Sequence, residues 1–350
     1  MAERLSDHTT LRLGGPARSW LRATTSEELV DAVRRCDEAG EPVLVLAGGS
    51  NLVVADDGFD GTVVEVATTG VAADHDGDRH GHQDGDHATC GGVVVTAAAG
   101  ESWEPLVEQA VEHGWMGLEA LSGVPGSVGA TPIQNVGAYG QEISQTLASV
   151  HVWDRKLRGL RTFAAADCGF GYRTSRFKAD PGRHVVLEVT LRLPQGRLGA
   201  PVAYAELADA LGVEPGGQAP MSDVRAAVLD LRRRKGMVLD PDDHDTWSAG
   251  SFFTNPLIPA EHLPHGAPSW PQSSGLVKTS AAWLIEHAGF GRGYGSGAAR
   301  VSTKHTLALT NRGGATTAEL LELAREIRGG VRRRFGVTLV NEPVLVGCEV

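Results

Sequence analysis

Short blocks of hydrophobic residues, separated by polar and glycine-rich turns, divide the chain into predicted helices and strands. The clearest helix signal is the capping box TSEE at residues 25–28, whose side chains satisfy the first free amides of a helix. Leu29, Val33 and Cys36 follow at helical spacing and form one apolar face. Gly40 then provides the residue without a Cβ that commonly ends a helix. We therefore predict a helix that starts near residue 26 and ends at Gly40.

The same reasoning predicts the other main elements of the chain. Capped or amphipathic segments predict helices at residues 102–114, 223–234, 279–287 and 316–334. Apolar runs bounded by turns predict strands at residues 43–46, 62–66, 92–97, 150–153, 185–193 and 337–346. Strands and helices that alternate with short connections indicate a mixed architecture of both elements.

Composition narrows the class of protein. The 350 residues suffice for two or three domains, and 41% apolar content is typical of a globular protein. No run is long enough to cross a bilayer, and the first ten residues lack the features of a signal peptide, so we expect no membrane association. A formal net charge of −11 argues against nucleic acid as a partner. The cysteines are far apart, which favours reduced thiols in a cytoplasmic protein and excludes a zinc site of the usual spacing.

Residues 117–142, GLEALSGVPGSVGATPIQNVGAYGQE, form the most informative segment. Its glycines permit positive φ and close approach of a ligand to the backbone, while Pro125 and Pro132 stiffen it. A stiff, nearly uncharged loop of this kind can present a row of backbone N–H groups to an anion such as a pyrophosphate. A glycine-rich connector is the simpler interpretation of this stretch alone.

Two further turns favour a ligand-binding loop over a simple glycine-rich connector. Residues 42–54, PVLVLAGGSNLVV, read as strand, tight turn and strand around Gly48 and Gly49, and residues 8–17, HTTLRLGGPA, add a third turn. Three phosphate-compatible turns in the first 142 residues favour a large dinucleotide cofactor.

Two other motifs are set aside. Residues 74–87, DHDGDRHGHQDGDH, could chelate a metal, but no ligand set is apparent, and we interpret them as a solvated hairpin tip between the strands around Val64 and Val94. Residues 293–298, GYGSGA, fit the relaxed dinucleotide fingerprint, which requires a preceding strand and a following helix. Here a predicted helix precedes and a strand-like run follows, so we reject a Rossmann site.

Three blocks in the second half carry candidate chemistry. Residues 170–178, FGYRTSRFK, contain Arg173; residues 249–256, AGSFFTNP, contain Ser251; and Glu342 lies between Asn341 and Pro343. Taken singly, Arg173 is explained as a surface charge and Ser251 as a turn former. Glu342 is more unusual, because a carboxylate within an apolar strand is costly to bury.

Together these blocks resemble the UDP-N-acetylenolpyruvoylglucosamine reductases over nearly the whole chain. The resemblance implies an α+β protein, with a two-part FAD-binding superfold of the vanillyl-alcohol-oxidase type and a smaller α+β substrate-binding domain. We expect FAD-binding subdomains at residues 1–70 and 71–238 and the substrate domain at residues 239–350. Within the family, the chain is similar to the subtype in which a mid-chain tyrosine closes over the substrate.

The resemblance also implies the activity. In the family, NADPH reduces FAD, and flavin N5 then delivers a hydride to the vinyl carbon of UDP-N-acetylglucosamine enolpyruvate to give UDP-N-acetylmuramate, a peptidoglycan precursor. Matching block to block makes Arg173, Ser251 and Glu342 the catalytic residues, with Ser251 as proton donor. A guanidinium suits the developing negative charge because it is planar and always protonated.

Binding residues follow from the same matches. We expect the cofactor at Gly48, Gly49, Ser50, Asn51, Leu52, Gly123, Ser127, Gly129, Ala130, Thr131 and Ile133. FAD is expected to bind noncovalently, because the two glycine-rich turns contain no histidine or cysteine. For the substrate we expect Tyr172, Tyr204, Arg232, Lys235, Asn255 and His305. Arg232 and Lys235 have an alternative role at the end of a helix, where cations complement the dipole, and His305 stands where some relatives are expected to have glutamine.

Two alternatives share parts of this pattern. A flavin-dependent oxidase would share the first half of the chain, and a non-catalytic nucleotide-sugar-binding protein would keep the pocket without needing Arg173, Ser251 and Glu342. Our leading hypothesis is a cytoplasmic, monomeric oxidoreductase that binds a small nucleotide sugar and no metal.

Overall fold

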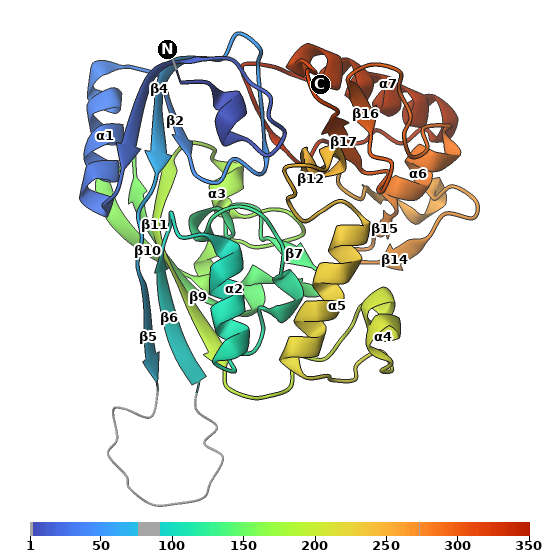
Figure 1. Cartoon of the computed structure of the whole chain (residues 1–350), viewed down its shortest axis with the longest axis horizontal. Helices are drawn as coiled ribbons and strands as arrows, with labels where there is room; N and C mark the ends of the chain where they lie inside the picture. Colours follow the sequence, from blue (N-terminus) through green and yellow to red (C-terminus); the bar gives the residue numbers. More distant parts are fainter. Residues whose placement is uncertain (1–2, 76–91, 273) are drawn as a thin grey trace, which may run out of the picture. The chain divides into compact units, whose positions relative to one another are not determined.

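The computed structural model describes residues 3–75, 92–272 and 274–350 (Figure 1). The fold divides into two compact units, which are described separately. The larger unit comprises Ser19–Gly48 and Gly61–Arg233, and the smaller unit comprises Met1–Arg18, Gly49–Asp60 and Arg234–Val350. The domain boundaries expected at residues 70 and 238 stay a prediction.

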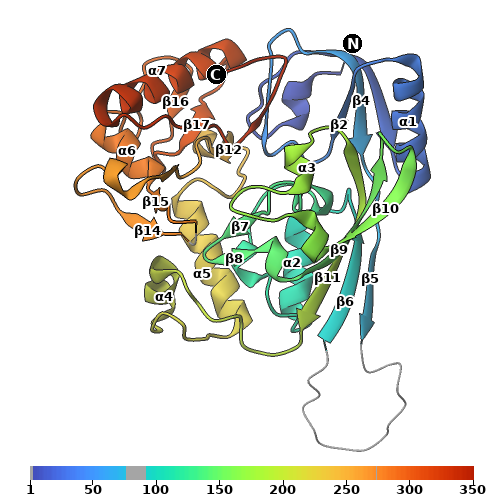
Figure 2. The same cartoon turned by 180° about the vertical axis from the view of Figure 1, so that it is seen from behind.

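A five-stranded antiparallel sheet, in the order β10-β9-β11-β6-β5, forms the centre of the larger unit (Figure 2). Its strands are β5 (Val71–His75), β6 (Gly92–Ala98), β9 (Leu147–Asp154), β10 (Gly159–Ala164) and β11 (His184–Pro194). Every second residue of β6 is buried, as expected for a strand with one face on a core. The helix α2 (Trp103–Glu112) contributes Trp103, Leu106 and Val107 to the same core.

A second sheet has the order β1-β4-β2 and carries the first predicted helix. Its strands are β1 (Ala17–Ala23), β2 (Val43–Leu46) and β4 (Phe59–Val66), and β2 pairs with β4 in parallel. The helix α1 (Ser26–Ala39) lies beside β2 (Figure 1). The Thr25 hydroxyl accepts from the Glu28 amide, and Gly40 ends α1 at φ +65°, so both predicted ends are confirmed.

Three helices and a short hairpin complete the larger unit. The hairpin consists of β7 (Gly137–Ala138) and β8 (Gln141–Glu142). The helices are α3 (Arg176–Ala179), α4 (Ala205–Leu211) and α5 (Met221–Arg234), of which α5 ends in the smaller unit. A separate apolar cluster, which includes Leu207, Val224 and Val228, holds α4 against α5.

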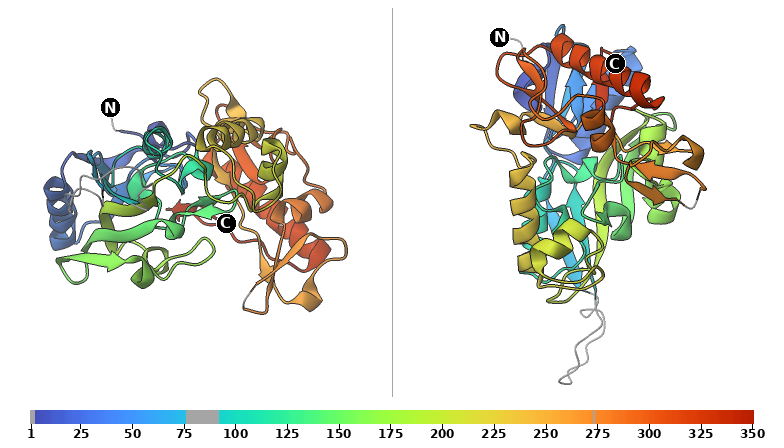
Figure 3. Two further views of the ribbon diagram at one scale, coloured as in Figure 1. Left: turned by 90° about the horizontal axis from the view of Figure 1, so that it is seen from below. Right: turned by 90° about the vertical axis from the view of Figure 1, so that its right-hand side faces the viewer.

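Among its described residues, the smaller unit contains three small sheets and two α-helices. Figure 3 shows most of this unit in orange and red. The sheet orders are β12-β17-β16, β13-β15-β14 and β18-β3. The bounds are β3 (Leu52–Val54), β12 (Ser248–Ser251), β13 (Leu257–Ile258), β14 (Ser269–Pro271), β15 (Val277–Thr279), β16 (Ala299–Val301), β17 (Ala308–Asn311), β18 (Val344–Val346), α6 (Ala281–His287) and α7 (Thr317–Phe335). Phe252, Phe253, Leu320 and Ile327 are fully buried in its core.

The structure corrects the last predicted strand. Only β18 is regular within residues 337–346, and Asn341 forms an isolated bridge to Phe253. Val340 is 63% exposed and Val344 is 43% exposed, so Glu342 does not lie within a buried apolar strand. Pro343 interrupts the segment because it lacks the N–H that a strand would donate.

The pairing around the histidine- and aspartate-rich segment also differs from expectation. β6 pairs with β5, whereas Val64 belongs to β4 in the other sheet. Of residues 74–87, only Asp74 and His75 lie within the described residues. Where the chain is described, no cluster of acidic, histidine or cysteine side chains could hold a metal ion. The described helices also include none with the length and apolar character needed to traverse a bilayer.

Candidate active site

The turn at Gly48 and Gly49 leaves no room for side chains. Gly49 has φ +56°, and a Cβ there would lie 1.9 Å from the carbonyl oxygen of His8. A Cβ on Gly48 would lie 2.6 Å from Cα of Gly126, in the long glycine-rich loop. Two of the turns recognised in the sequence therefore meet at Gly48, and both positions require glycine for close backbone approach.

The amides of this turn match the predicted anion site. Within the described part of the chain, the N–H groups of Gly48, Gly49 and Ser50 donate to no protein acceptor. The Asn51 side chain instead bonds the Glu342 carbonyl at 3.5 Å, and the Asn51 carbonyl accepts from the Val344 amide at 3.0 Å. Consecutive amides of this kind make an anion-binding concavity. Leu52 begins β3 next to them.

The long loop offers fewer amides than the sequence suggested. The amides of Gly129, Ala130 and Thr131 donate to Ala99, Ser127 and Val128, respectively, and the Gly123 amide donates to the Glu104 carboxylate. The expectation of a row of amides aimed at a ligand is therefore wrong for these positions. The bonds of Ala130 and Thr131 close the short helical turn at residues 128–130, whereas the bond of Gly129 ties this turn to Ala99.

Ser127 is the exception in that loop. Its side chain is 4% exposed, and its hydroxyl has no hydrogen-bond partner among the described residues. Gly129 lies so close to Ala99 that a Cβ there would be 2.5 Å from the Ala99 Cβ. Ile133 packs on the core, and its carbonyl accepts from the Ser175 hydroxyl at 2.5 Å. A buried, unsatisfied hydroxyl is uncommon and marks a position that a ligand can satisfy.

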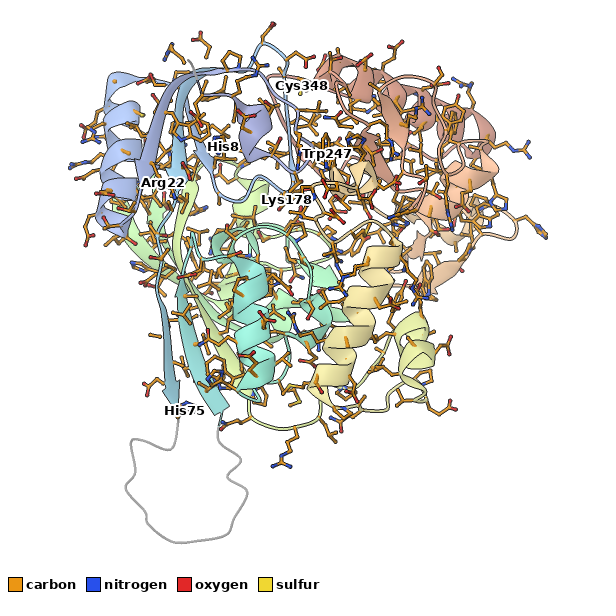
Figure 4. All side chains as sticks on the ribbon, viewed as in Figure 1. His8, Arg22, His75, Lys178, Trp247 and Cys348 are labelled. Atoms are coloured by element: carbon orange, nitrogen blue, oxygen red, sulfur yellow. The ribbon has the colours of Figure 1, made fainter. Side chains whose placement is uncertain are left out.

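Arg173 is held in the larger unit by backbone carbonyls. Its Nη2 donates to the Gly137 carbonyl at 2.6 Å and its Nη1 to the Asn135 carbonyl at 3.4 Å. Arg173 itself has φ +53°, a left-handed conformation that is uncommon outside glycine. The Lys178 ammonium donates to the Arg173 carbonyl at 3.1 Å, and the Tyr172 ring lies 5.7 Å from the guanidinium carbon. Figure 4 labels Lys178 on α3.

Ser251 and Glu342 come together in the smaller unit. Ser251 is the last residue of β12 and pairs with Ala308 of β17. The next residue, Phe252, is buried, and its carbonyl accepts from the Glu342 amide at 2.8 Å. Because the Asn51 side chain also bonds the Glu342 carbonyl, hydrogen bonds connect the segments that carry Ser251, Glu342 and the glycine turn into one assembly.

Thr10 is a residue of this assembly that the sequence did not single out. Its hydroxyl donates to the Ser248 carbonyl at 2.7 Å and lies 3.4 Å from the Ser50 carbonyl, and its amide bonds Gly49 at 3.2 Å. It thus joins β12 to the glycine turn. The turn at residues 8–17 was recognised as a motif, but nothing in its composition distinguishes Thr10 from Thr9.

The predicted substrate residues occupy different environments. Tyr204 is 47% exposed and meets the Tyr139 ring edge-on at 5.5 Å between centroids. Arg232 is 8% exposed, and burial lowers the pKa of its guanidinium. Lys235 is half-buried directly after α5.

Two predicted substrate residues also have local structural roles. The Asn255 side-chain oxygen accepts from the Ala281 amide at 2.9 Å, at the start of α6. His305 lies in the turn between β16 and β17, where its amide donates to the Ser302 hydroxyl. The rejected fingerprint at residues 293–298 follows α6 and precedes β16, so the reason for rejecting it is confirmed.

The comparisons with known proteins agree over the whole chain. Residues 240–346 match the family described as UDP-N-acetylenolpyruvoylglucosamine reductase, C-terminal domain, and residues 17–156 match an FAD binding domain. A protein named UDP-N-acetylenolpyruvoylglucosamine reductase from Cutibacterium acnes is 55% identical over 349 residues, covering 99% of this chain and 90% of that protein. The chain belongs to the UDP-N-acetylenolpyruvoylglucosamine reductase family.

Other reductases of the family also match nearly the full length of the chain. The protein of that name from Thermobifida fusca is 53% identical and covers 99% of this chain and 97% of its own length. The crystal structure of the reductase from Thermus caldophilus superposes with a TM-score of 0.65 at 26% identity, covering 99% of both chains. The predicted fold class, an FAD-binding domain with the C-terminal domain of this reductase family, is confirmed.

The chain fits the cofactor that its FAD-binding domain implies. Gly48, Gly49 and Ser50 present consecutive amides of the kind that bind a pyrophosphate, and within the larger unit the buried hydroxyl of Ser127 has no partner among the described residues. The close approach of Gly48 to Gly126 leaves bare backbone on both sides of the turn.

Proposed function

We infer that this chain reduces the enolpyruvyl ether of UDP-N-acetylglucosamine enolpyruvate to UDP-N-acetylmuramate with NADPH, a step of peptidoglycan precursor synthesis. The observation that carries this inference is the hydrogen-bonded assembly of the glycine turn, Ser251 and Glu342 in a chain of this reductase family. One compact unit thereby joins a cofactor turn to two groups that can act on a reacting substrate.

The predicted cofactor-binding residues have different roles. Gly48, Gly49 and Ser50 present amides, Asn51 fixes the turn to the Glu342 segment, and Ser127 adds a hydroxyl from the long loop. When bound, FAD would accept a hydride from NADPH and pass it to the terminal vinyl carbon of the substrate. We propose that the binding is noncovalent.

Arg173 is proposed to stabilise the charge that develops in the substrate. A hydride added to the terminal carbon forms a C–H bond and breaks the C=C π bond, so negative charge moves to the neighbouring carbon and its carboxylate. A preorganised guanidinium is worth several kcal/mol at such a charge because it need not reorient during the reaction. The carbonyls of Asn135 and Gly137 hold the guanidinium in place for this role.

Ser251 is proposed to complete the reduction. The carbanionic carbon takes the hydroxyl proton of Ser251, which turns the vinyl group into the lactyl ether and leaves the serine to be reprotonated from solvent. Glu342, whose amide is fixed to Phe252, is proposed to share in stabilising the charge that develops on the substrate. A serine is a weak acid, but the substrate enolate is a strong enough base to take its proton.

Tyr204 supports a narrower assignment to the subtype with a closing tyrosine. The residue is 47% exposed and its ring meets the Tyr139 ring edge-on, and we propose that the ring turns towards a bound nucleotide sugar. We propose that Lys235 and Arg232 contact the diphosphate and that Tyr172, Asn255 and His305 line the rest of the substrate site. We further propose a monomer in the cytoplasm, where NADPH and nucleotide sugars are available.

A simple titration tests the function. The purified protein is expected to be yellow, to bleach with NADPH under nitrogen, and to regain its colour when UDP-N-acetylglucosamine enolpyruvate is added. Recovery of colour only on admission of oxygen would indicate an oxidase instead. A protein that binds the nucleotide sugar but takes up no FAD would contradict the proposal.

A further inference from the structure

We propose that Asn135 is a positioning residue, which sets the orientation of the Arg173 guanidinium for the reduction of the substrate. This inference rests on the proposed role of Arg173. It adds a residue from the glycine-rich loop that acts through the arginine and not on the substrate itself.

The guanidinium is oriented by two carbonyls that Asn135 controls. The Asn135 carbonyl accepts from Nη1 of Arg173, and the Gly137 carbonyl, two residues further along, accepts from Nη2. Two acceptors on two terminal nitrogens fix the plane of the group as well as its position. The backbone of residues 135–137 therefore decides where the positive charge points.

The Asn135 side chain fixes that backbone. It is 1% exposed, and its Nδ2 donates to the Glu142 carboxylate at 2.7 Å and to the Gly171 carbonyl at 3.2 Å. Its Oδ1 accepts from the Ser144 amide at 3.1 Å. One amide group thus ties together the start of the hairpin, its end and the segment that leads into Arg173.

Backbone conformation points to the same residue. Asn135 has φ +49° and Arg173 has φ +53°. Such conformations cost free energy and persist where the surroundings fix them, which is often at functional sites. Asparagine tolerates this region better than other residues with a side chain, whereas an arginine there needs support.

The Arg173 guanidinium lies close to the backbone at Gly137, with no room for a side chain between them. A Cβ on Gly137 would lie 2.8 Å from Cγ of Glu142 and 3.2 Å from Nη1 of Arg173. The guanidinium therefore packs directly against bare backbone, and a small movement of the hairpin would displace it. Misplacement of a catalytic group by about 1 Å can reduce a rate roughly 100-fold.

The test uses Asn135→Asp, which keeps the size and the acceptor for Ser144. It replaces the donor that faces Glu142 and Gly171 with an oxygen, so both Nδ2 bonds are lost. The two half-reactions are measured separately by stopped-flow, with NADPH for reduction of the flavin and with UDP-N-acetylglucosamine enolpyruvate for its reoxidation. We expect reoxidation to slow at least 10-fold while reduction by NADPH stays within 2-fold.

A double-mutant cycle with Arg173→Lys tests whether Asn135 acts through the arginine. Lysine cannot span the two carbonyls, so Asn135→Asp should slow reoxidation no further in the Arg173→Lys background. Asn311→Asp is the matched control: Asn311 is also buried and loses two donations, to the Leu11 and Arg12 carbonyls, but in the smaller unit. In the Asn311→Asp, Arg173→Lys double variant, the fold-reductions in the reoxidation rate caused by the two substitutions should multiply.

A spectroscopic measurement provides a readout independent of activity. In protein labelled with ¹⁵N-arginine, the Nη signals that disappear in Arg173→Lys should show slow rotation in the unsubstituted protein and fast rotation in Asn135→Asp. Asn135→Gly, which keeps the positive φ without adding charge, serves if Asn135→Asp does not fold. The assignment would be overturned if the effects of Asn135→Asp and Arg173→Lys on the reoxidation rate multiplied independently. It would also be overturned if Asn135→Asp slowed both half-reactions equally. Failure of the unsubstituted protein to reoxidise would instead refute the proposed function.

Discussion

The amide of Glu342 donates a hydrogen bond to the carbonyl of Phe252 at 2.8 Å, which places the glutamate segment beside the end of β12. Ser251 precedes Phe252, and the buried Phe252 and Phe253 rings anchor this part of the chain in the core. The two candidate groups therefore depend on one rigid support.

Ser251→Ala should slow reoxidation of the flavin by the substrate roughly 10²–10⁴-fold, the usual contribution of a general acid. The reduction of the flavin by NADPH should change little, because no proton from Ser251 is needed there. Stopped-flow absorbance measures both steps. Equal losses in the two half-reactions would show that Ser251 is not the acid.

Gly49→Ala should destabilise the turn and abolish FAD binding. Its new methyl group would lie 1.9 Å from the His8 carbonyl oxygen, so the backbone must move. We expect a loss of roughly 3 kcal/mol or more in the free energy of unfolding. Gly212→Ala is the control, since Gly212 has φ +67° with no neighbouring atom within 4 Å and should cost only about 1 kcal/mol. The free energy of unfolding in urea and the amount of bound FAD are measured for both variants. Equal losses of stability in Gly49→Ala and Gly212→Ala would contradict the steric argument.

Asp154 should make stability fall at acidic pH. Hydrogen bonds from Arg183 are the largest cause that lowers the pKa of this buried carboxyl, from 3.8 to about 2. The stabilisation is therefore complete above pH 4 and lost as the pH falls towards 2, with a total of about 2 kcal/mol. Asp154→Asn should be less stable at pH 7 and lose less between pH 5 and pH 3 in urea unfolding. An unchanged slope would exclude this pair as the cause.

His184 should make the stability of the fold depend on pH at higher values than Asp154 does. It lies between the Phe163 and Phe177 rings, and burial is the largest cause that lowers the pKa of its imidazole. Below its ordinary pKa of 6.5 the unfolded chain binds a proton that the folded chain does not, so stability decreases with falling pH. His184→Phe should remove this slope between pH 7 and pH 5 in urea unfolding. The exposed His262, changed to Asn, should leave it unchanged.

Tyr204→Phe should raise the KM for the nucleotide sugar up to roughly 10-fold, the loss expected when the closing tyrosine can no longer form a hydrogen bond to the bound substrate. Reduction of the flavin by NADPH should be unaffected. Tyr294→Phe is the control, because the Tyr294 hydroxyl donates to Glu326 at 2.6 Å in the other unit. An unchanged KM in Tyr204→Phe would argue against the closing-tyrosine subtype.

The sequence predicts those parts of the fold that local chemistry determines. The cap at Thr25, the stop at Gly40 and the apolar face of α1 follow from spacing alone, and the structure confirms them. The turn at Gly48 and Gly49 is also recognisable from its glycines, although its close approaches to His8 and Gly126 are contacts with distant parts of the chain. Family similarity rests on these local motifs and on their order along the chain.

Long-range pairing lies beyond this reasoning. Strand periodicity shows that residues 43–46 and 52–54 are extended, but not that β2 pairs with β4 while β3 pairs with β18. The support of Arg173 was missed for a related reason. Its partners are the backbone carbonyls of Asn135 and Gly137, and a carbonyl leaves no signature in the amino-acid sequence.

The pairing of β3 with β18 also bears on the order in which the chain folds during synthesis. Leu52 and its parallel partner Val344 are far apart in the sequence, so all the residues between them must be translated before the two strands can pair. All residues of the larger unit have been made once Arg233 is added, whereas the smaller unit needs its C-terminal segment. A nascent chain stalled before Val344 therefore cannot complete the ladder next to the cofactor turn, and competence for FAD should arise only after Val344 has left the ribosome.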